Sequence, residues 1–387
     1  MRYFVVHAHL YQPPREDPWS EVIPRQPSAA PFHDWNERIS DECYERLGSA
    51  AVYGPNGDVL SIVNLFGRMS FNIGPTLAAW LQRERPEVLL DANAGVRAAA
   101  ERTGTGPALM QPYGHSILPL ANRQEKRLLL AWGRDDFRAR FGREPRGVWL
   151  PETAVDLETL EVCADLGLEF TVLAPEQILQ VRPLTGAGSW EDVSGGRCPT
   201  HRPLRVTLPS GRRFHVFVFH GQLSRDTAFG GVLHSGERLL DAARGALDGM
   251  PESSGLVLLA ADGETFGHHQ RGAESAVAEG LVRARLSGQA RVTHLEEVLD
   301  DLPATHEARI ATPSAWSCAH GVGRWGRDCG CRMSHPPGWN QEWRAPLRSA
   351  VVSLRDRVFS LIERHGESIV RDSWETLEAY GPLLAQP

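Results

Sequence analysis

Short apolar runs alternate with amphipathic stretches along most of the chain, and this alternation constrains the fold more than any other feature. Such runs are typical of strands that are buried on both faces. They span residues 3–9, 59–64, 147–150, 169–173 and 256–261, and residues 214–219 could form a further strand. The amphipathic stretches 74–83, 122–141 and 156–166 predict helices, the first with Pro75 in its opening turn. Strands that alternate with helices along a chain predict a parallel barrel or a doubly wound sheet.

Two long stretches break this alternation and suggest how the chain is organised. Residues 181–203 are rich in Gly and Pro, and residues 303–345 hold four of the eleven tryptophans. After them, Leu347, Val351, Leu354, Val358 and Leu361 follow one another three or four residues apart, a spacing that predicts an amphipathic helix. A single α/β barrel holds roughly 250 residues. We therefore expect a barrel over residues 1–302, and over 303–387 a Trp- and Cys-rich loop and C-terminal helices that pack on it.

Composition and charge exclude several classes of protein. With 42% hydrophobic and 23% charged residues the chain is of ordinary globular composition. A net charge of −7 would repel a phosphate backbone, so nucleic acid is not an expected partner. No apolar run is long enough for a membrane span, and no secretory signal opens the chain. We expect a cytoplasmic protein whose six cysteines stay reduced; the sequence leaves the oligomeric state open.

Two histidines end the first apolar run. His7 and His9 are two residues apart, so both point to the same face of the predicted strand. Barrel enzymes build their sites at the carboxyl ends of the strands. The pair could bind a metal or hydrogen-bond a polar ligand, and it could also be two hydrogen-bonded core histidines.

Carboxylates follow two other predicted strands. Glu152 comes just after the run 147–150, and Asp262 and Glu264 follow the most apolar run, with His268 and His269 beside them. Two strand-end carboxylates are what double displacement at an anomeric carbon requires, because one attacks and the other protonates the leaving oxygen. A carboxylate in the first turn of the next helix would also be favoured by the helix dipole, and this is an alternative for Glu152.

The late cysteines form a different kind of cluster. Cys318, His320, Cys329 and Cys331 offer three thiols and an imidazole, a set that suits structural zinc. Their one-residue spacers differ from the usual two-residue knuckle, so the spacing alone favours reduced, packed side chains over zinc. Residues 321–326 match a dinucleotide fingerprint, but no strand precedes them. The chain has no Gly-x-Ser-x-Gly, phosphate-loop or His-Glu-x-x-His motif.

Four of these stretches together resemble the motifs of glycoside hydrolase family 57. They are residues 7–13, 111–115, 149–152 and 261–268, and the likeness extends over most of the chain. The strings 33–38, 71–76 and 338–341 look like a family-57-related subgroup whose substrate the sequence does not specify. The resemblance implies an incomplete seven-stranded (β/α) barrel with a helical segment after it, and a retaining mechanism on α-glucans or malto-oligosaccharides.

The resemblance also implies roles for individual residues. Glu152 would be the nucleophile and Asp262 the general acid/base, with no metal and no cofactor. The residues expected to bind substrate are His7, His9, Gln12, His115, Trp149, Glu264 and His268. If these roles hold, the carboxyl groups of Glu152 and Asp262 face each other about 5 to 6 Å apart, the separation of retaining enzymes.

Two other functions remain open from the residues. A metal-dependent barrel hydrolase of the polysaccharide deacetylase or mannosidase type would use His7, His9 and Asp262 as ligands. A glycan-binding protein without catalysis would keep the same sugar contacts. Within the leading interpretation, hydrolysis and glycosyl transfer cannot be separated, because water and an acceptor hydroxyl attack the same intermediate.

Overall fold

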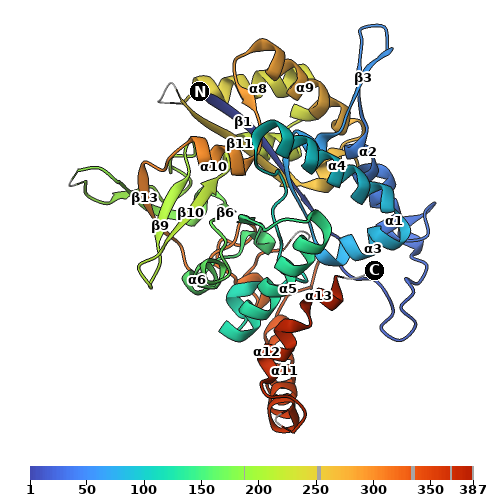
Figure 1. The fold of residues 1–387 in the computed structure, drawn as a ribbon, viewed down its shortest axis with the longest axis vertical. Coiled ribbons are helices and arrows are strands. Elements are labelled where there is room, and N and C mark those ends of the chain that lie inside the picture. Colours follow the sequence, from blue (N-terminus) through green and yellow to red (C-terminus); the bar gives the residue numbers. More distant parts are fainter. Residues whose placement is uncertain (187, 251–253, 333–335, 367, 386–387) are drawn as a thin grey trace.

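A ring of parallel strands forms the centre of the computed structural model, and most helices lie around it (Figure 1). The structure describes the whole chain except residues 187, 251–253, 333–335, 367 and 386–387. The gaps at 187 and 333–335 fall inside the two long stretches that break the alternation. The strands of the ring are β1 (Arg2–Leu10), β4 (Ser70–Ile73), β5 (Gly147–Val148), β6 (Phe170–Leu173), β10 (Arg213–Val218) and β11 (Gly255–Asp262).

Hydrogen bonds place these strands in one order around the ring. β1 pairs in parallel with β11 and β4, and β6 pairs in parallel with β5 and β10. Residues 108–110 join the two groups through parallel bridges from Ala108 to Phe71 and from Met110 to Val148. On the other side, the amide of His220 donates to the carbonyl of Leu258 at 2.7 Å. The order is β1, β4, 108–110, β5, β6, β10 and β11, seven segments of the described chain.

The interior of the ring is filled by every second residue of its strands. One buried apolar cluster takes Tyr3 and Val5 from β1, Leu256 and Leu258 from β11, and Phe170 and Val172 from β6, together with Leu109, Trp149 and Phe217. Because side chains alternate along a strand, the next residues of the same parity face the carboxyl-end mouth of the ring. His7, His9 and Asp262 have this parity.

The helices expected from the sequence form close to their predicted bounds. They are α3 (Pro75–Glu84), α5 (Arg123–Phe141) and α6 (Leu157–Asp165). The side chain of Asn122 accepts from the amide of Glu125, whose own side chain accepts from the amide of Asn122. Further helices are α1 (Trp35–Ile39), α2 (Glu45–Gly48), α4 (Pro86–Thr103), α7 (Gly221–Phe229), α8 (Gly236–Asp248), α9 (Ala273–Ser287) and α10 (Leu295–Asp301).

Several strands lie outside the ring. β7 (Ile178–Pro183), β8 (Glu191–Asp192), β9 (Leu204–Thr207) and β13 (His306–Ile310) extend the sheet of β6 and β10, and β12 (Arg291–Val292) pairs with the start of β1. β2 (Ala50–Tyr53) and β3 (Val59–Val63) form a separate antiparallel hairpin. The expectation that 59–64 is buried on both faces is wrong, since Ile62 is 59% exposed. An apolar run shows that a strand is favoured but not which sheet it joins; here β4 takes the place in the ring.

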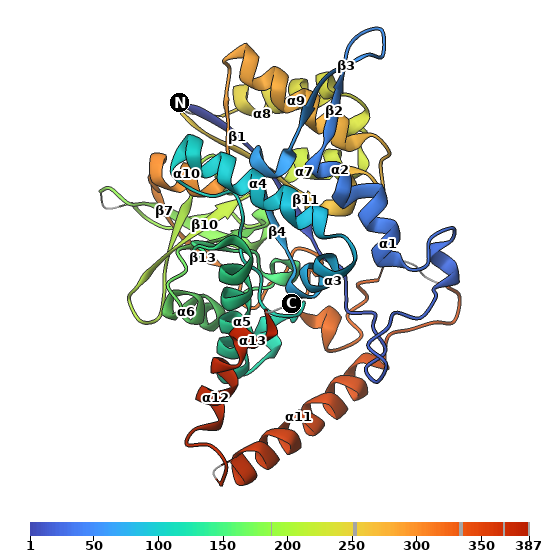
Figure 2. The same cartoon turned by 45° about the vertical axis from the view of Figure 1, so that its right-hand side comes forward.

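The chain ends in α11 (Arg344–Gly366), α12 (Ser373–Ala379) and α13 (Gly381–Leu384). α12 and α13 return to α5, where the indole of Trp132 donates to the carbonyl of Leu377 at 2.7 Å. α11 lies along the outside of the molecule (Figure 2), where Arg348 contacts the carbonyl of Leu120 and Arg355 donates to Glu125 at 3.2 Å. The expected packing of its apolar stripe on the main domain is wrong, because the residues stay exposed, Leu354 by 63%. Helical periodicity identifies an apolar face, but only the tertiary structure decides what covers it.

The expected α/β fold class, a barrel followed by C-terminal helices, is confirmed. No helix in the described part of the chain has both the length and the apolarity to cross a bilayer. The cytoplasmic location stays a prediction.

Candidate active site

Strand register brings three polar residues to one level of the barrel mouth. His9 on β1 pairs with Asp262 on β11 on one side and with Asn72 on β4 on the other. Neighbouring strands of a sheet lie about 4.8 Å apart, so the three backbones are adjacent. Parity turns all three side chains toward the inside of the ring.

Asn72 holds both histidines in place. Its Oδ1 lies 3.2 Å from Nε2 of His7 and 3.2 Å from Nδ1 of His9, and its Nδ2 donates to Oε1 of Gln111 at 2.7 Å. Trp149 stacks on both imidazoles, with ring centroids 4.5 Å from His7 and 5.3 Å from His9. The two histidines are therefore locked between one amide and one indole ring.

Burial keeps these imidazoles neutral. It lowers the pKa of His7 to about 3, and it lowers the pKa of His9 well below the ordinary value, with the charge of His115 acting in the same direction. His7 and Trp149 are fully enclosed. Both side chains therefore lie beneath His9, which keeps a small exposed area, and their expected role in lining the sugar subsite stays a prediction.

A short stack of rings continues from His9 toward the surface. Nε2 of His9 lies 3.2 Å from Nε2 of His115, and the ring of His115 stacks on Tyr11 with centroids 4.0 Å apart. His115 is half-buried. The loop 111–115, one of the four stretches that resemble the family motifs, thus lies beside the predicted histidine pair.

Glu152 lies on the far side of the ring from Asp262, because β5 and β11 are separated by β6 and β10 in one direction and by β1, β4 and 108–110 in the other. Its backbone is left-handed, with φ of 58°. Oε2 accepts hydrogen bonds from the indole of Trp316 at 3.0 Å and from the hydroxyl of Ser317 at 2.5 Å. The alternative that Glu152 opens the following helix is wrong, since α6 begins at Leu157 and Asp156 caps it.

Asp262 is the carboxyl group with the most altered acidity at the mouth. Its side chain is exposed there, yet protein atoms around it remove much of its hydration. Desolvation raises the pKa of Asp262 to about 7, and the negative charges of Glu264 and Glu152 add to the rise. A carboxyl group of this kind holds a proton at neutral pH for part of the time and can deliver it.

Glu264 belongs to a network behind Asp262. It accepts from the hydroxyl of Tyr44, and from Nε2 of Gln12 at 2.9 Å. Oε1 of Gln12 in turn accepts from Arg15 at 2.7 Å. Desolvation raises the pKa of Glu264. Gln12 is buried in this network, so the structure shows both residues supporting the loop after β11.

His268 lies further along the same loop. Its Nδ1 contacts the carboxylate of Glu42, and its ring meets Trp35 edge-on with centroids 5.8 Å apart. Both residues come from the segment between β1 and β2. His268 is thus held at the edge of the site by Trp35, which lies in the string 33–38, and by Glu42, which no sequence motif singled out.

The chain matches the models of two known families. Residues 5–311 match the model of glycosyl hydrolase family 57, and residues 339–387 match a domain of unknown function, DUF3536. The chain belongs to glycosyl hydrolase family 57. The predicted family is confirmed, and with it the prediction of a glycoside hydrolase or transglycosylase. A comparison with curated protein sequences found no significant match.

Solved structures of other proteins share the family-57 fold. An exo-type maltose-forming amylase from Pyrococcus sp. ST04 is 15% identical with a TM-score of 0.68, over 98% of this chain and 67% of that one. A branching enzyme of the family from Thermococcus kodakaraensis is 14% identical with a TM-score of 0.61, over 99% and 86%. A 4-α-glucanotransferase from Thermococcus litoralis is 15% identical with a TM-score of 0.55, over 81% and 43%. Identities this low show the fold alone.

The arrangement of His7 and His9 at the mouth of the barrel does not support the alternative of a metal-dependent hydrolase. Asn72 occupies Nε2 of His7 and Nδ1 of His9, so the paired nitrogens do not converge on an open point. Among the described residues, the one group whose ligand atoms converge in the way a metal requires is Cys318, His320, Cys329 and Cys331.

Sequence reasoning missed several residues of the family-57 site. Asn72 sits on a strand too short to stand out, although it occurs in the string 71–76 that resembles the subgroup. Trp316 appeared only as one tryptophan among several, and Tyr44 and Ser317 carried no signal. They come from loops and helices far from their partners in sequence, and only folding brings them to Glu264 and Glu152.

Proposed function

We propose that the chain is a retaining glycosidase or 4-α-glucanotransferase-type enzyme for α-glucans or malto-oligosaccharides, with Glu152 as nucleophile and Asp262 as general acid/base. One observation carries the proposal. Across the ring from Glu152, whose Oε2 is held by two donors, Asp262 has its pKa raised to about 7. Carboxyl groups in contrasting surroundings are the arrangement that separates nucleophile from acid.

The chemistry follows from these two positions. The protonated Asp262 delivers its proton to the glycosidic oxygen while Glu152 attacks the anomeric carbon, and a glycosyl-enzyme ester forms as the leaving sugar departs. The carboxylate of Asp262 then takes a proton from water or from an acceptor hydroxyl, which attacks the anomeric carbon and frees Glu152. Among the described residues none hydrogen-bonds Oε1 of Glu152, so this oxygen is available for the attack.

The contacts around His9 support a sugar as the substrate. A neutral imidazole offers one donor and one acceptor, which suits a hydroxyl group. His9, His115 and Tyr11 present such groups in one stack beside Asp262. The class of sugar rests on the structural neighbours, which are named as an amylase, a branching enzyme and a 4-α-glucanotransferase.

Product analysis tests the proposal. The full chain is incubated with linear and branched α-glucans of graded length, and proton NMR follows the anomer that is released first while chromatography sizes the products. We expect α-anomers, with shorter chains alone if water is the acceptor and with longer chains as well if a sugar is. Release of the β-anomer, or activity that Glu152→Gln leaves intact, would overturn the proposal.

A further inference from the structure

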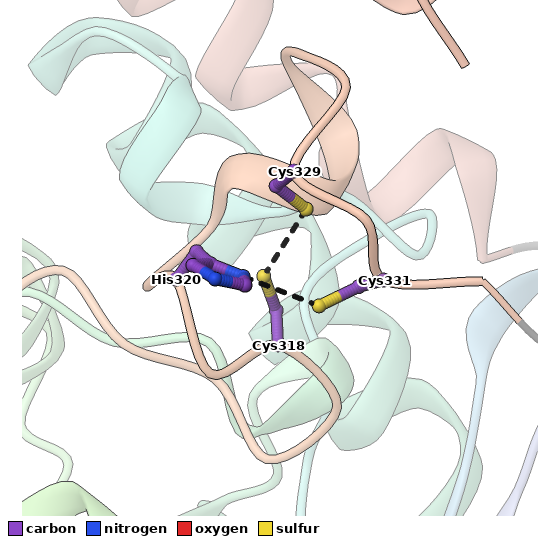
Figure 3. A group of neighbouring side chains, drawn as sticks. All are labelled: Cys318, His320, Cys329 and Cys331. Atoms are coloured by element: carbon purple, nitrogen blue, oxygen red, sulfur yellow. Dashed lines mark hydrogen bonds between the residues drawn. The ribbon is translucent and has the colours of Figure 1, made fainter. Parts of the chain in front are cut away.

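Three thiols and one imidazole converge on a single point in the loop after β13. Cys318, His320, Cys329 and Cys331 turn their side chains toward one another (Figure 3), and one ligand atom from each lies within 4.8 Å of all the others. The four residues lie between the two matched family models, which end at 311 and begin at 339. We propose that they bind one Zn²⁺ ion as a structural site.

The distances fit a tetrahedral zinc ion. Zinc binds sulfur at about 2.3 Å and nitrogen at about 2.0 to 2.1 Å, so a tetrahedron requires sulfur atoms about 3.8 Å apart and sulfur and nitrogen about 3.5 Å apart. Sγ of Cys318 and Sγ of Cys329 are 3.9 Å apart, and Sγ of Cys331 lies 3.4 Å from Nδ1 of His320. All three cysteines are free thiols. These two separations match a tetrahedral site, and all four ligand atoms lie within 4.8 Å of one another.

The backbone conformation explains how two cysteines with a single residue between them can bind the same metal ion. Gly330, between Cys329 and Cys331, has φ of +83°, a conformation that other residues rarely adopt. On an extended strand the side chains of Cys329 and Cys331 would point to the same face. The left-handed turn at Gly330 instead curves the backbone, so that both thiols point toward the same position. Cys318 is brought to the same point by an antiparallel bridge with Ala315. The spacing that argued against zinc in the sequence is therefore accommodated by the fold.

Two arginines lie beside the cluster and would offset part of its negative charge. Three thiolates and one Zn²⁺ leave a net charge of −1. Arg344 donates to the carbonyl of Cys331 at 3.3 Å, and Arg324 donates to the carbonyl of Ser317 at 3.2 Å. His320 is exposed and Cys318 is buried, so the group lies at the surface where an ion can enter.

The zinc site would fix residues 314–317, a short arm of the loop that contacts Glu152. Trp316 and Ser317 directly precede Cys318, and both donate to Oε2 of Glu152. On its other side the arm is anchored by the antiparallel bridge between Ser314 and Val155. With zinc bound, both ends of this short arm are fixed. The metal then acts as a positioning element for Glu152, a consequence that rests on the proposed function, whereas zinc binding itself does not.

Metal analysis of the purified full chain tests the proposal. We expect one zinc per chain in the native protein and in Cys198→Ser, a control that removes a buried thiol outside the cluster. Cys331→Ser should hold less than a tenth as much zinc after dialysis, with circular dichroism showing an intact fold. Exchange of the metal for Co²⁺ in the native protein should give thiolate-to-cobalt absorption and the visible bands of a tetrahedral ion. This second measurement does not depend on any variant folding.

Three outcomes would overturn the site: native protein without zinc, iron in its place, or zinc retained by Cys331→Ser. Hydrogen exchange tests the positioning role separately. Removal of the metal should speed amide exchange over residues 314–318, and an unchanged rate there would refute the role. A chain that binds zinc as expected but is inactive on α-glucans would contradict the proposed function and leave the metal site standing.

Discussion

The indole N–H of Trp316 donates to Oε2 of Glu152 at 3.0 Å across 164 positions of sequence. Ser317 donates to the same oxygen, and the amide of Trp316 also bonds the carbonyl of Glu152 at 3.1 Å. The loop after β13 therefore fixes one oxygen of this carboxylate and its backbone at once. Activity should depend on a loop that supplies neither of the two carboxylates.

Trp316→Phe removes the indole donor and keeps most of the ring. A hydrogen bond to a charged group is worth about 1.5 to 3 kcal/mol, so we expect kcat on an α-glucan to fall by about tenfold or more. The matched control is Trp325→Phe, which changes another tryptophan of the same loop, one that packs against Ala315 and Val322. This variant should keep its kcat. An unchanged kcat in Trp316→Phe would show that the indole does not orient Glu152.

Asp262→Asn removes the proton donor but leaves Glu152 in place. Turnover of a natural glucan should fall by several orders of magnitude, since general acid catalysis contributes about 10²- to 10⁴-fold. An aryl glycoside with a good leaving group needs no protonation, so the rate at which the variant forms the glycosyl-enzyme from it should fall far less. If a well-folded Asp262→Asn variant loses its activity on both substrates to the same extent, the general acid is another group, and Glu264 is the next residue to test.

The pH profile should show the state of Asp262. Because the acid must be protonated, kcat/KM should fall as the pH rises through the pKa of about 7. Desolvation is the main cause of that raised pKa, and the charge of Glu264 is the next. Glu264→Gln removes this charge, so the alkaline limb should move to lower pH. Glu42→Gln, which changes the partner of His268 instead, should leave the limb in place.

Acid should destabilise the protein through its buried histidines. The pKa of His7 is lowered to about 3 in the folded chain, against about 6.5 when unfolded. Its contribution to stability is complete above pH 6.5 and is lost as the pH falls toward 3. At pH 5 the loss should reach about 2 kcal/mol.

Urea unfolding at pH 7 and pH 5 measures this contribution. In His7→Gln the difference in free energy of unfolding between the two pH values should shrink by about 2 kcal/mol, whatever the variant loses in overall stability. His365→Gln, at an exposed site on α11, is the control. An equal difference in native protein and His7→Gln would mean that His7 is not buried neutral.

The separation of the two carboxylates is a prediction for the complex with a sugar. We expect the carboxyl groups of Glu152 and Asp262 to lie about 5 to 6 Å apart, the retaining value. A crystal structure with a slowly hydrolysed α-glucan analogue would measure it. A distance beyond about 9 Å in that complex would remove the pairing of nucleophile and acid.

Local patterns in the sequence determined much of this protein. The alternation of apolar runs and amphipathic stretches predicted a parallel barrel or a doubly wound sheet, and the resemblance to family 57 favoured the barrel. His7, His9, Glu152 and Asp262 stood out because a polar group directly after a buried strand must lie at the strand end. The amphipathic stretches that begin at Asn122 and Asp156 predicted helices there, and these two residues are the N-caps of α5 and α6. These features depend on residues a few positions apart, which periodicity and local hydrogen bonding govern.

Only the tertiary structure decided which surfaces and side chains meet. It moved 59–63 out of the ring, left the apolar stripe of α11 uncovered, and enclosed His7 and Trp149 beneath His9. It also brought Trp316 to Glu152 and gathered three thiols and an imidazole around one point. Such contacts join residues tens to hundreds of positions apart. Their free energy depends on packing and burial in the finished fold, which no local pattern in the chain encodes.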